Sequence, residues 1–381
     1  MMLSEGKRPS GCARAWVEID LSALANNVAD LRAQLPAGCE LMAVVKADAY
    51  GHGADRVAAR LRDEGVDSFN VATVDEGVRL RESGLAGEIL VLGYTHPDCA
   101  EFLSTYRLAQ LVVDGEYAKS LDAAGFKIDV HIAVDTGMHR LGIEPSHFNE
   151  IEEIFSSKNL KVEGVATHLA SSDSLTEDDL IFTSKQMEEF KAVVDALKSR
   201  GHDVGKLHAQ ASYGIYNHPE ISCDYARAGI ALYGVMSYDG ETKIKPALRP
   251  VLSLKALVAQ VREIGAGEGV SYNRTFTADK PMKLATVSVG YADGVPRQMS
   301  GKGAACLING RKVPVIGLIC MDMLIIDVTE AGCVSAGDIV TLIGRDGDEE
   351  IRCEEVAAAS GTITNDILCR LGSRLPRVYL D

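Results

Sequence analysis

Short apolar runs alternate with amphipathic stretches through about residue 245 of the chain. The first amphipathic stretch follows Asp20, a residue type that often caps a helix, and its leucines recur at helical spacing. Eight apolar runs have the length of buried strands: Leu41–Lys46, Phe69–Thr73, Ile89–Gly93, Ala109–Val113, Ile128–Val134, Val162–Thr167, Lys206–Gln210 and Ala226–Ala231. Eight strands alternating with helices predict an α/β fold, a (β/α)8 (TIM) barrel. A doubly wound open sheet is the alternative that the pattern alone leaves open.

The pattern changes near residue 246, where helical periodicity nearly disappears. Apolar segments punctuated by Gly and Asp follow, among them Leu252–Val261, Leu284–Val289, Val313–Ile319 and Ile339–Ile343. This texture predicts a second, all-β domain. We therefore expect a barrel over residues 14–245 and a C-terminal β-domain over residues 246–381.

Composition narrows the class of protein. The 381 residues are 46% hydrophobic and 24% charged, which is typical of globular domains. A net charge of -15 argues against nucleic acid or an anionic membrane as a partner. No apolar stretch approaches the roughly 18 residues that span a bilayer, and the start of the chain lacks the apolar core of a signal peptide. Nine cysteines without paired metal-type spacing indicate reduced thiols, a cytoplasmic location and no zinc site.

Lys46 ends the first apolar run, at the end of a strand where α/β enzymes keep their chemistry. A desolvated lysine has a lowered pKa and can act as a nucleophile or base. The alternative is a lysine without a chemical role, whose ammonium group extends from the strand end into solvent. The segment from Lys46 through Tyr50 to Gly53 resembles the cofactor-binding lysine motif of alanine racemases and the related serine racemases. The resemblance implies that Lys46 holds pyridoxal phosphate (PLP) as a Schiff base and that Tyr50 contacts its phosphate.

The resemblance covers essentially the whole chain after about Ala13. It implies an N-terminal barrel and a C-terminal β-domain, paired head to tail as a homodimer. Each active site then combines one subunit's barrel with the partner's β-domain and acts on a small amino acid.

Two segments at the end of the barrel fit a phosphate site. Backbone N–H groups after the last strands of barrels commonly bind phosphate, and Gly229 and Ile230 are placed for that. An ordinary strand with a packing glycine is the alternative. The resemblance adds Ser212 as a hydroxyl donor to phosphate, His208 as part of the cofactor network, and Arg227 at the pyridine nitrogen. Because guanidinium keeps its proton, that nitrogen stays unprotonated, which suppresses transamination.

Two further motifs contribute to the barrel's site. The resemblance implies that His168 links Arg227 to the catalytic tyrosine. In the segment Asp135–Gly142, the resemblance implies that Arg140 contacts the cofactor's phenolic oxygen and the substrate carboxylate, since a guanidinium fork suits oxyanions. Many relatives carry a lysine, often carbamylated, where this chain has Ala133, so the group that orients Arg140 is open.

The β-domain carries three further segments that match the family. The first, Gly269–Phe276, contains Tyr272, the second catalytic base by this resemblance. Tyr291 stands in a second segment near the substrate entrance. In a third, the backbone N–H of Met321 binds the substrate carboxylate. Ordinary packing is the alternative for Tyr272 and for Met321.

Asn365 stands where ordinary alanine racemases have a tyrosine. This asparagine resembles the serine racemase domain of vancomycin-resistance-type racemases, which are often tethered to membrane helices absent from this chain. The alternative is that Asn365 only caps a helix over Asp366–Leu371.

Taken together, the residues and the resemblance predict a PLP-dependent isomerase that racemises serine, alanine or both by two bases, Lys46 and the partner's Tyr272. Cell-wall precursor supply and antibiotic resistance are both compatible roles. An alanine-only racemase is the main alternative. A non-catalytic PLP-binding protein and a fold-related PLP decarboxylase fit the motifs less well.

Overall fold

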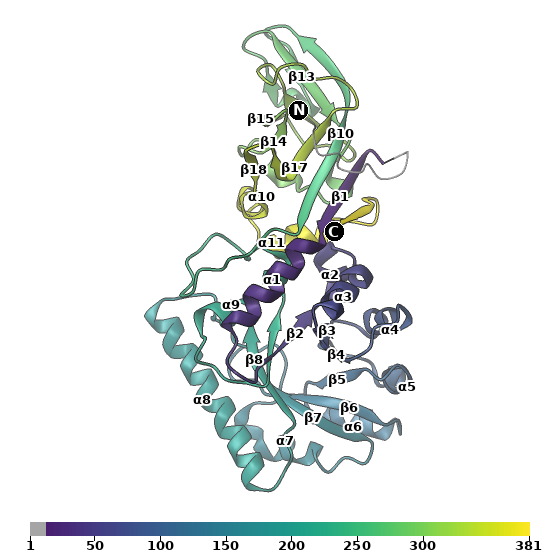
Figure 1. Ribbon diagram of the computed structural model, residues 1–381, viewed down its shortest axis with the longest axis vertical. Helices are drawn as coiled ribbons and strands as arrows, with labels where there is room; N and C mark the ends of the chain where they lie inside the picture. Colours follow the sequence, from purple (N-terminus) through teal and green to yellow (C-terminus); the bar gives the residue numbers. More distant parts are fainter. Residues whose placement is uncertain (1–12) are drawn as a thin grey trace.

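The computed structural model describes residues 13–381, so the start of the chain, on which the signal-peptide expectation rests, lies outside the described residues. Eight parallel strands close into a barrel (Figure 1). They are β2 (Glu40–Val44), β3 (Ser68–Val71), β4 (Glu88–Val91), β5 (Ala109–Val112), β6 (Ile128–Ala133), β7 (Leu160–Ala166), β8 (Lys206–Ala211) and β9 (Tyr225–Ala228). Closure occurs where β2 pairs with β9. The predicted barrel is thus confirmed, and the open sheet is excluded.

Helices surround the barrel on its outside (Figure 1). They are α1 (Leu21–Gln34), α3 (Ala54–Asp63), α4 (Val74–Glu82), α5 (Ala100–Thr105), α6 (Gly115–Ala123), α7 (Phe148–Ile154), α8 (Glu177–Ser199) and α9 (Ser212–Asn217). The predicted cap of α1 is present, because the Asp20 carboxylate accepts a hydrogen bond of 2.9 Å from Ala23 N. Within residues 13–381, no helix has both the length and the apolar character needed to cross a bilayer.

The second domain is built on a nine-stranded sheet in the order β18-β17-β14-β15-β16-β13-β10-β1-β19. Its strands are β1 (Ala15–Asp20), β10 (Leu252–Ile264), β13 (Met282–Val287), β14 (Ala305–Ile308), β15 (Arg311–Ile316), β16 (Leu324–Asp327), β17 (Ile339–Asp346), β18 (Glu349–Ile351) and β19 (Arg377–Leu380). A small hairpin, β11 (Gly269–Val270) with β12 (Phe276–Thr277), extends from it. The expected β-domain is present, and it also contains two short helices, α10 (Cys353–Ser360) and α11 (Thr364–Arg370).

The first described strand differs from the expected domain assignment. The sequence places residues 14–20 with the barrel, whereas β1 pairs antiparallel with β10 and parallel with β19 in the other sheet. Trp16, Val17 and Ile19 are buried there. A short apolar strand carries no information about which of two sheets it joins, because the pairing partners lie far away in the sequence.

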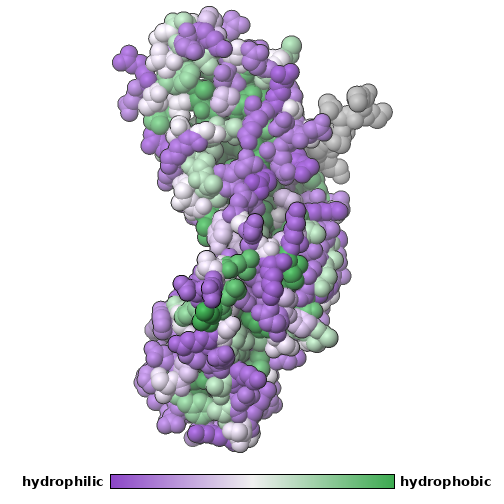
Figure 2. Space-filling view, turned by 90° about the vertical axis from the view of Figure 1, so that its left-hand side faces the viewer, coloured by the Kyte–Doolittle hydropathy of each residue, from purple (hydrophilic) through white to green (hydrophobic). Residues whose placement is uncertain are grey.

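The two domains meet at a constriction (Figure 2). At this junction α11 packs against α2 (Lys46–Gly51), the short element that follows the first barrel strand (Figure 1). The approach is close, since a Cβ at Gly51 would lie 2.4 Å from Leu368 O. Residues of α11 are thereby brought to the mouth of the barrel.

Candidate active site

A cavity of about 500 Å³ opens at the carboxyl ends of the barrel strands. Ten of the residues predicted for the site line it: Lys46, Tyr50, Arg140, His168, His208, Ser212, Arg227, Gly229, Ile230 and Asn365. They come from segments spread over more than three hundred residues of sequence. Barrel enzymes carry their chemistry at this end of the strands.

Lys46 begins a turn of unusual backbone conformation. The four residues from Ala47 to Tyr50 all have φ between 52° and 56°, the left-handed region that non-glycine residues rarely occupy. Each such residue costs roughly 1–2 kcal/mol. Strain of this kind persists where surrounding structure fixes it, and it concentrates at functional sites.

Glu76 holds this turn in place. Its role was not among the sequence-based predictions. Its carboxylate accepts hydrogen bonds from Ala47 N at 2.6 Å and from Ala72 N at 2.7 Å. Glu76 also closes a capping box with Thr73 at the start of α4. That box is a signal readable in the sequence, but nothing local shows that the same carboxylate reaches the lysine turn.

The environment of Lys46 favours a neutral amine. Burial lowers the pKa of the Lys46 ammonium, and the positive charge of Arg140 lowers it further, against the opposing effect of Glu76. A larger neutral fraction makes the amine a better nucleophile and base.

His52 secures the other side of the turn. Its Nδ1 lies 2.9 Å from both Ala49 O and Tyr50 O. Because carbonyl oxygens only accept, this nitrogen carries the proton. The ring is fully buried, and burial lowers the pKa of His52 to about 4; burial likewise lowers the pKa of His168 to about 3.

These histidines predict a loss of stability in acid. An unfolded histidine titrates near 6.5, so between about pH 6.5 and 4 the unfolded chain binds more protons than the folded chain does. The free energy of unfolding should therefore fall with falling pH, by up to about 1.4 kcal/mol per pH unit for each histidine. His52→Asn keeps a donor near Ala49 O but does not titrate. Urea denaturation at several pH values should show a shallower fall in this variant, and identical slopes would contradict the assignment.

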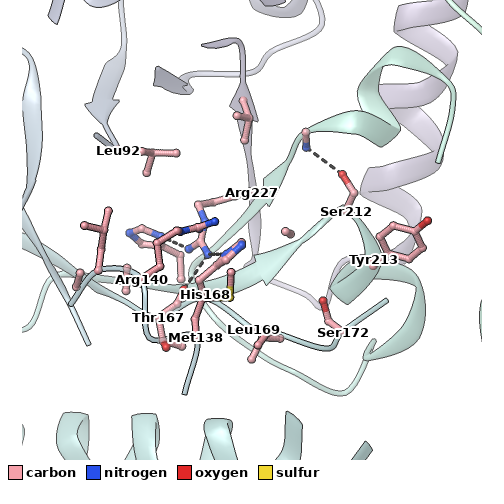
Figure 3. Close-up of a pocket in the computed structure, with 18 of the residues that line it drawn as sticks. Leu92, Met138, Arg140, Thr167, His168, Leu169, Ser172, Ser212, Tyr213 and Arg227 are labelled. Atoms are coloured by element: carbon pink, nitrogen blue, oxygen red, sulfur yellow. Dashed lines mark hydrogen bonds between the residues drawn. The ribbon is translucent and has the colours of Figure 1, made fainter. Parts of the chain in front are cut away.

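Hydroxyl and N–H groups gather at one end of the cavity. Ser212 Oγ accepts a hydrogen bond from Gly229 N at 3.0 Å (Figure 3). It also accepts one from Ala231 N at 3.2 Å. A Cβ at Gly229 would lie 2.9 Å from the Tyr50 hydroxyl oxygen, so only glycine allows this approach. Burial raises the pKa of Tyr50, which keeps its hydroxyl a donor. Such donors fit a phosphate.

Arg227 lies in the wall of the cavity and is almost completely buried. Its guanidinium donates to Thr167 O at 2.8 Å and Ala209 O at 2.9 Å, and contacts His208 Nδ1 at 2.5 Å and His168 Nδ1 at 3.1 Å (Figure 3). Burial lowers the pKa of Arg227 only to about 10, so it stays charged near neutral pH. Burial, reinforced by Arg227, lowers the pKa of both histidines, so both are neutral acceptors.

Arg140 lines the cavity, and no side chain within residues 13–381 pairs with its guanidinium. The nearby Asp135 is used elsewhere: its carboxylate accepts from Gly137 N and His139 N, each at 3.0 Å, and pairs with His139 Nδ1 at 3.2 Å. Asp135 therefore shapes the loop rather than the arginine. Ala133 also lines the cavity and offers no polar group. The Arg140 donors remain available to an anion.

A buried glutamine braces the loop that carries His168. Gln186 on α8 is fully buried; its Oε1 accepts from Ala170 N at 2.9 Å, and its Nε2 donates to His168 O at 3.2 Å. Its Nε2 also donates to Thr136 Oγ1, which pairs with Thr167 Oγ1 at 2.7 Å. Nothing in the sequence points to Gln186, because a single glutamine on an amphipathic helix gives no signal.

Asn365 is not the cap of α11. The helix begins at Thr364 after Ile363, whereas the alternative expected a helix from Asp366 capped by Asn365. The Asn365 side chain lines the cavity, and its Oδ1 is buried with no hydrogen-bond partner in the described part of the chain. The capping interpretation is therefore wrong, because the helix begins two residues too early for it.

Three predicted residues of the second domain do not line this cavity. The exposed fraction is 64% for Tyr272, 41% for Tyr291 and 53% for Met321. Tyr291 and Met321 lie together, since Tyr291 N donates to Cys320 O at 3.0 Å and Ala292 N donates to Met321 O at 2.9 Å.

Family models match nearly the whole chain. One described as "Alanine racemase, N-terminal domain" matches residues 19–237, and one described as "Alanine racemase, C-terminal domain" matches residues 251–379. An amino-acid racemase of Enterococcus faecalis is 43% identical over 97% of this chain, and a serine/alanine racemase of Enterococcus gallinarum is 39% identical over 97%. The chain spans about half of these two relatives, 52% of each. An alanine racemase of Carboxydothermus hydrogenoformans is 39% identical over 96% of this chain and 99% of its own.

Solved structures agree. An alanine racemase of Clostridium difficile 630 has a TM-score of 0.90 and 32% identity, covering 97% of each chain. An alanine racemase of Bartonella henselae with covalently bound pyridoxal phosphate has a TM-score of 0.84 and 32% identity, covering 97% of this chain and 100% of that one.

Proposed function

The chain belongs to the alanine racemase family, and we propose that it is a PLP-dependent racemase that interconverts the L and D enantiomers of serine and of alanine. One observation carries the proposal: a single cavity holds an amine of lowered pKa, a cluster of phosphate donors and a buried guanidinium. This donor set fits PLP, which carries an aldehyde, a phosphate and a ring nitrogen. Lys46 would bind the aldehyde carbon, and Tyr50, Ser212, Gly229 and Ile230 the phosphate.

Bound PLP withdraws electrons from the α-carbon of an attached amino acid and so weakens its Cα–H bond. The protein then has to move one proton between two faces. Lys46 removes or returns it on one face, serving the D enantiomer. Tyr272 of the partner subunit does so on the other, serving the L enantiomer. General acid–base groups of this kind must lie within hydrogen-bond reach of the proton.

Arg227 and Arg140 have different tasks in this proposal. Arg227 keeps its proton, because its pKa of about 10 remains well above neutral pH. It would therefore face the ring nitrogen of bound PLP as a donor and leave that nitrogen unprotonated, which would limit electron withdrawal and favour return of the proton to Cα. Arg140, with unpaired donors at the cavity wall, binds the substrate carboxylate.

The exposed residues of the second domain support a homodimer with shared sites. Tyr272, Tyr291 and Met321 are exposed in one chain and do not reach its own cavity. In a head-to-tail dimer they complete the partner's cavity, and the Met321 N–H then reaches the substrate carboxylate. A C2 pair forms two equivalent sites of this kind.

A racemisation assay tests the proposal directly. Purified protein supplied with PLP should convert L-serine and L-alanine into their D enantiomers, as measured by chiral chromatography. Conversion of alanine but not serine would indicate that the protein is an alanine-only racemase. Conversion of neither, with PLP bound, would exclude the proposed activity.

The unpaired oxygen of Asn365 predicts a role in serine selectivity. A serine hydroxyl can donate to Oδ1, which otherwise lacks a partner. A tyrosine here would fill the space of that hydroxyl. Because an unsatisfied buried polar group costs about 1–3 kcal/mol, Asn365→Tyr should lower kcat/KM for serine by about tenfold to hundredfold and spare alanine.

The matched control is Asn365→Ala, which removes the oxygen without filling the pocket. It should lower kcat/KM for serine and leave alanine nearly unchanged. Equal losses for both amino acids in both variants would mean that Asn365 does not read the substrate side chain.

A further inference from the structure

The interior of the barrel contains a continuous line of polar side chains beneath Arg227. His208 Nδ1 lies 2.5 Å from the Arg227 guanidinium, and His208 Nε2 lies 2.8 Å from His131 Nδ1. On the far side, His131 Nε2 lies 2.9 Å from Glu88 Oε1. The distance is short, but the two atoms are not aligned as a hydrogen bond, and neither has a hydrogen-bond partner in the described chain. The line thus runs from the cavity wall to a carboxylate.

The strands explain why these side chains meet. Glu88 is on β4, His131 on β6 and His208 on β8. In a (β/α)8 barrel, one layer of interior side chains comes from alternate strands, and these layers are ordinarily filled by branched apolar residues. Both histidines are fully buried, while the Glu88 side chain is 26% exposed.

Gly164 on β7 leaves the room that the two histidines need. A Cβ at this position would lie 2.5 Å from His131 Nδ1, the atom that faces His208, and 2.6 Å from Lys206 O. A side chain there would displace the His131 ring or the neighbouring backbone. The glycine therefore preserves the contact between the rings.

Only one arrangement of protons satisfies every contact. A guanidinium has donors and no acceptor, so His208 Nδ1 must accept from Arg227. The neutral His208 ring then carries its proton on Nε2 and donates to His131 Nδ1. His131 in turn carries its proton on Nε2, which faces the Glu88 carboxylate at 2.9 Å. Burial is the largest single influence on Glu88 and opposes its ionisation, but the interactions with His131, Tyr225 and Ser68 together outweigh burial and lower the pKa of Glu88.

We propose that Glu88 and His131 are positioning residues for Arg227, which hold its guanidinium at the cavity wall through a chain of two hydrogen bonds that ends on a close contact with the Glu88 carboxylate. The chain fixes both histidines as neutral Nε2–H tautomers. Glu88 also contacts Ser68 Oγ at 3.4 Å and interacts with the Tyr225 side chain. The positions of the protons follow from these contacts and do not depend on the proposed function. Only the role of Arg227 toward the cofactor rests on it.

The first test needs neither cofactor nor turnover. Protein with ¹⁵N-labelled histidine side chains should show both buried rings neutral and protonated on Nε2. Glu88→Gln keeps an acceptor oxygen and should leave these tautomers in place. Glu88→Leu removes the acceptor and should change the His131 signals. Nδ1–H rings in the wild type, or identical spectra for Glu88→Leu, would overturn the proposal.

The second test measures whether loss of the Glu88 contact impairs the function of Arg227 in turnover. Glu88→Leu should lower kcat by about tenfold to hundredfold, in the range of a lost hydrogen bond to a charged group, with KM nearly unchanged. Glu88→Gln should stay within about threefold of the wild type. Asp129→Asn is the matched control, since this carboxylate lies near Glu88 but outside the chain. Equal losses in the Gln and Leu variants, or no loss in either, would overturn the proposal. If the protein is inactive, the histidine tautomers measured in the first test still show whether the predicted arrangement of protons exists.

Discussion

Replacing Lys46 by alanine should abolish racemisation and remove the visible absorbance of the bound cofactor. The amine is the one group in the cavity that can bind the aldehyde covalently, and burial together with Arg140 lowers its pKa so that it can react near neutral pH. The left-handed turn from Ala47 to Tyr50 holds this amine beside the phosphate donors. The variant loses both the covalent attachment and one of the two bases, so turnover should fall below detection.

Absorbance and mass spectrometry measure the result. Borohydride treatment of the wild type should fix the cofactor on the peptide that contains Lys46, and the same treatment of Lys46→Ala should fix none. Lys119→Ala, a substitution of an exposed lysine far from the cavity, should behave as the wild type. Cofactor fixed to any other lysine would refute the assignment.

Replacing Tyr272 by phenylalanine should lower activity by about 10²–10⁴-fold, the usual contribution of a general acid–base group. Tyr272 is 64% exposed in one chain and does not line its own cavity, so the substitution should leave cofactor binding intact. Retained absorbance with lost turnover separates a proton-transfer role from a role in holding the cofactor. Tyr94→Phe, at another exposed tyrosine, is the matched control. Near-normal turnover of Tyr272→Phe would show that the second base lies elsewhere.

Mixing the two inactive proteins tests whether the site is shared. A dimer of one Lys46→Ala subunit and one Tyr272→Phe subunit contains one site with both bases intact. After random exchange half of the dimers are mixed, so activity should return to about a quarter of the wild type. No recovery, with subunit exchange demonstrated by native mass spectrometry, would place both bases within one subunit.

Much of the fold could be predicted from the sequence because burial is periodic. Each barrel strand is covered on both faces, so it appears as a continuous apolar run such as that ending near Lys46. The helices between them keep a polar outer face and show a different period. The loss of helical period near residue 246 likewise reports the sheet that follows. The barrel residues of the site could be predicted because they stand in long motifs at strand ends.

Other features have no local signature. Nothing in the residues around Glu76 shows that its carboxylate braces the Lys46 turn, and a lone Gln186 on a helix does not reveal that it holds the His168 loop. The position of Asn365 inside α11, rather than at its cap, depended on where the helix begins. β1 could have joined either sheet, since strand pairing is decided by partners distant in the sequence.

The sequence by itself determined the two kinds of domain, the eight barrel strands and the residue types that gather at their ends, because these follow from local periodicity and from motifs. Only the tertiary structure decided which side chains touch. Closure of the barrel sets the stagger between strands, and that stagger brings Glu88, His131 and His208 from three alternate strands into one line beneath Arg227. Such contacts arise from the geometry of the closed sheet as a whole, which no single stretch of the chain contains.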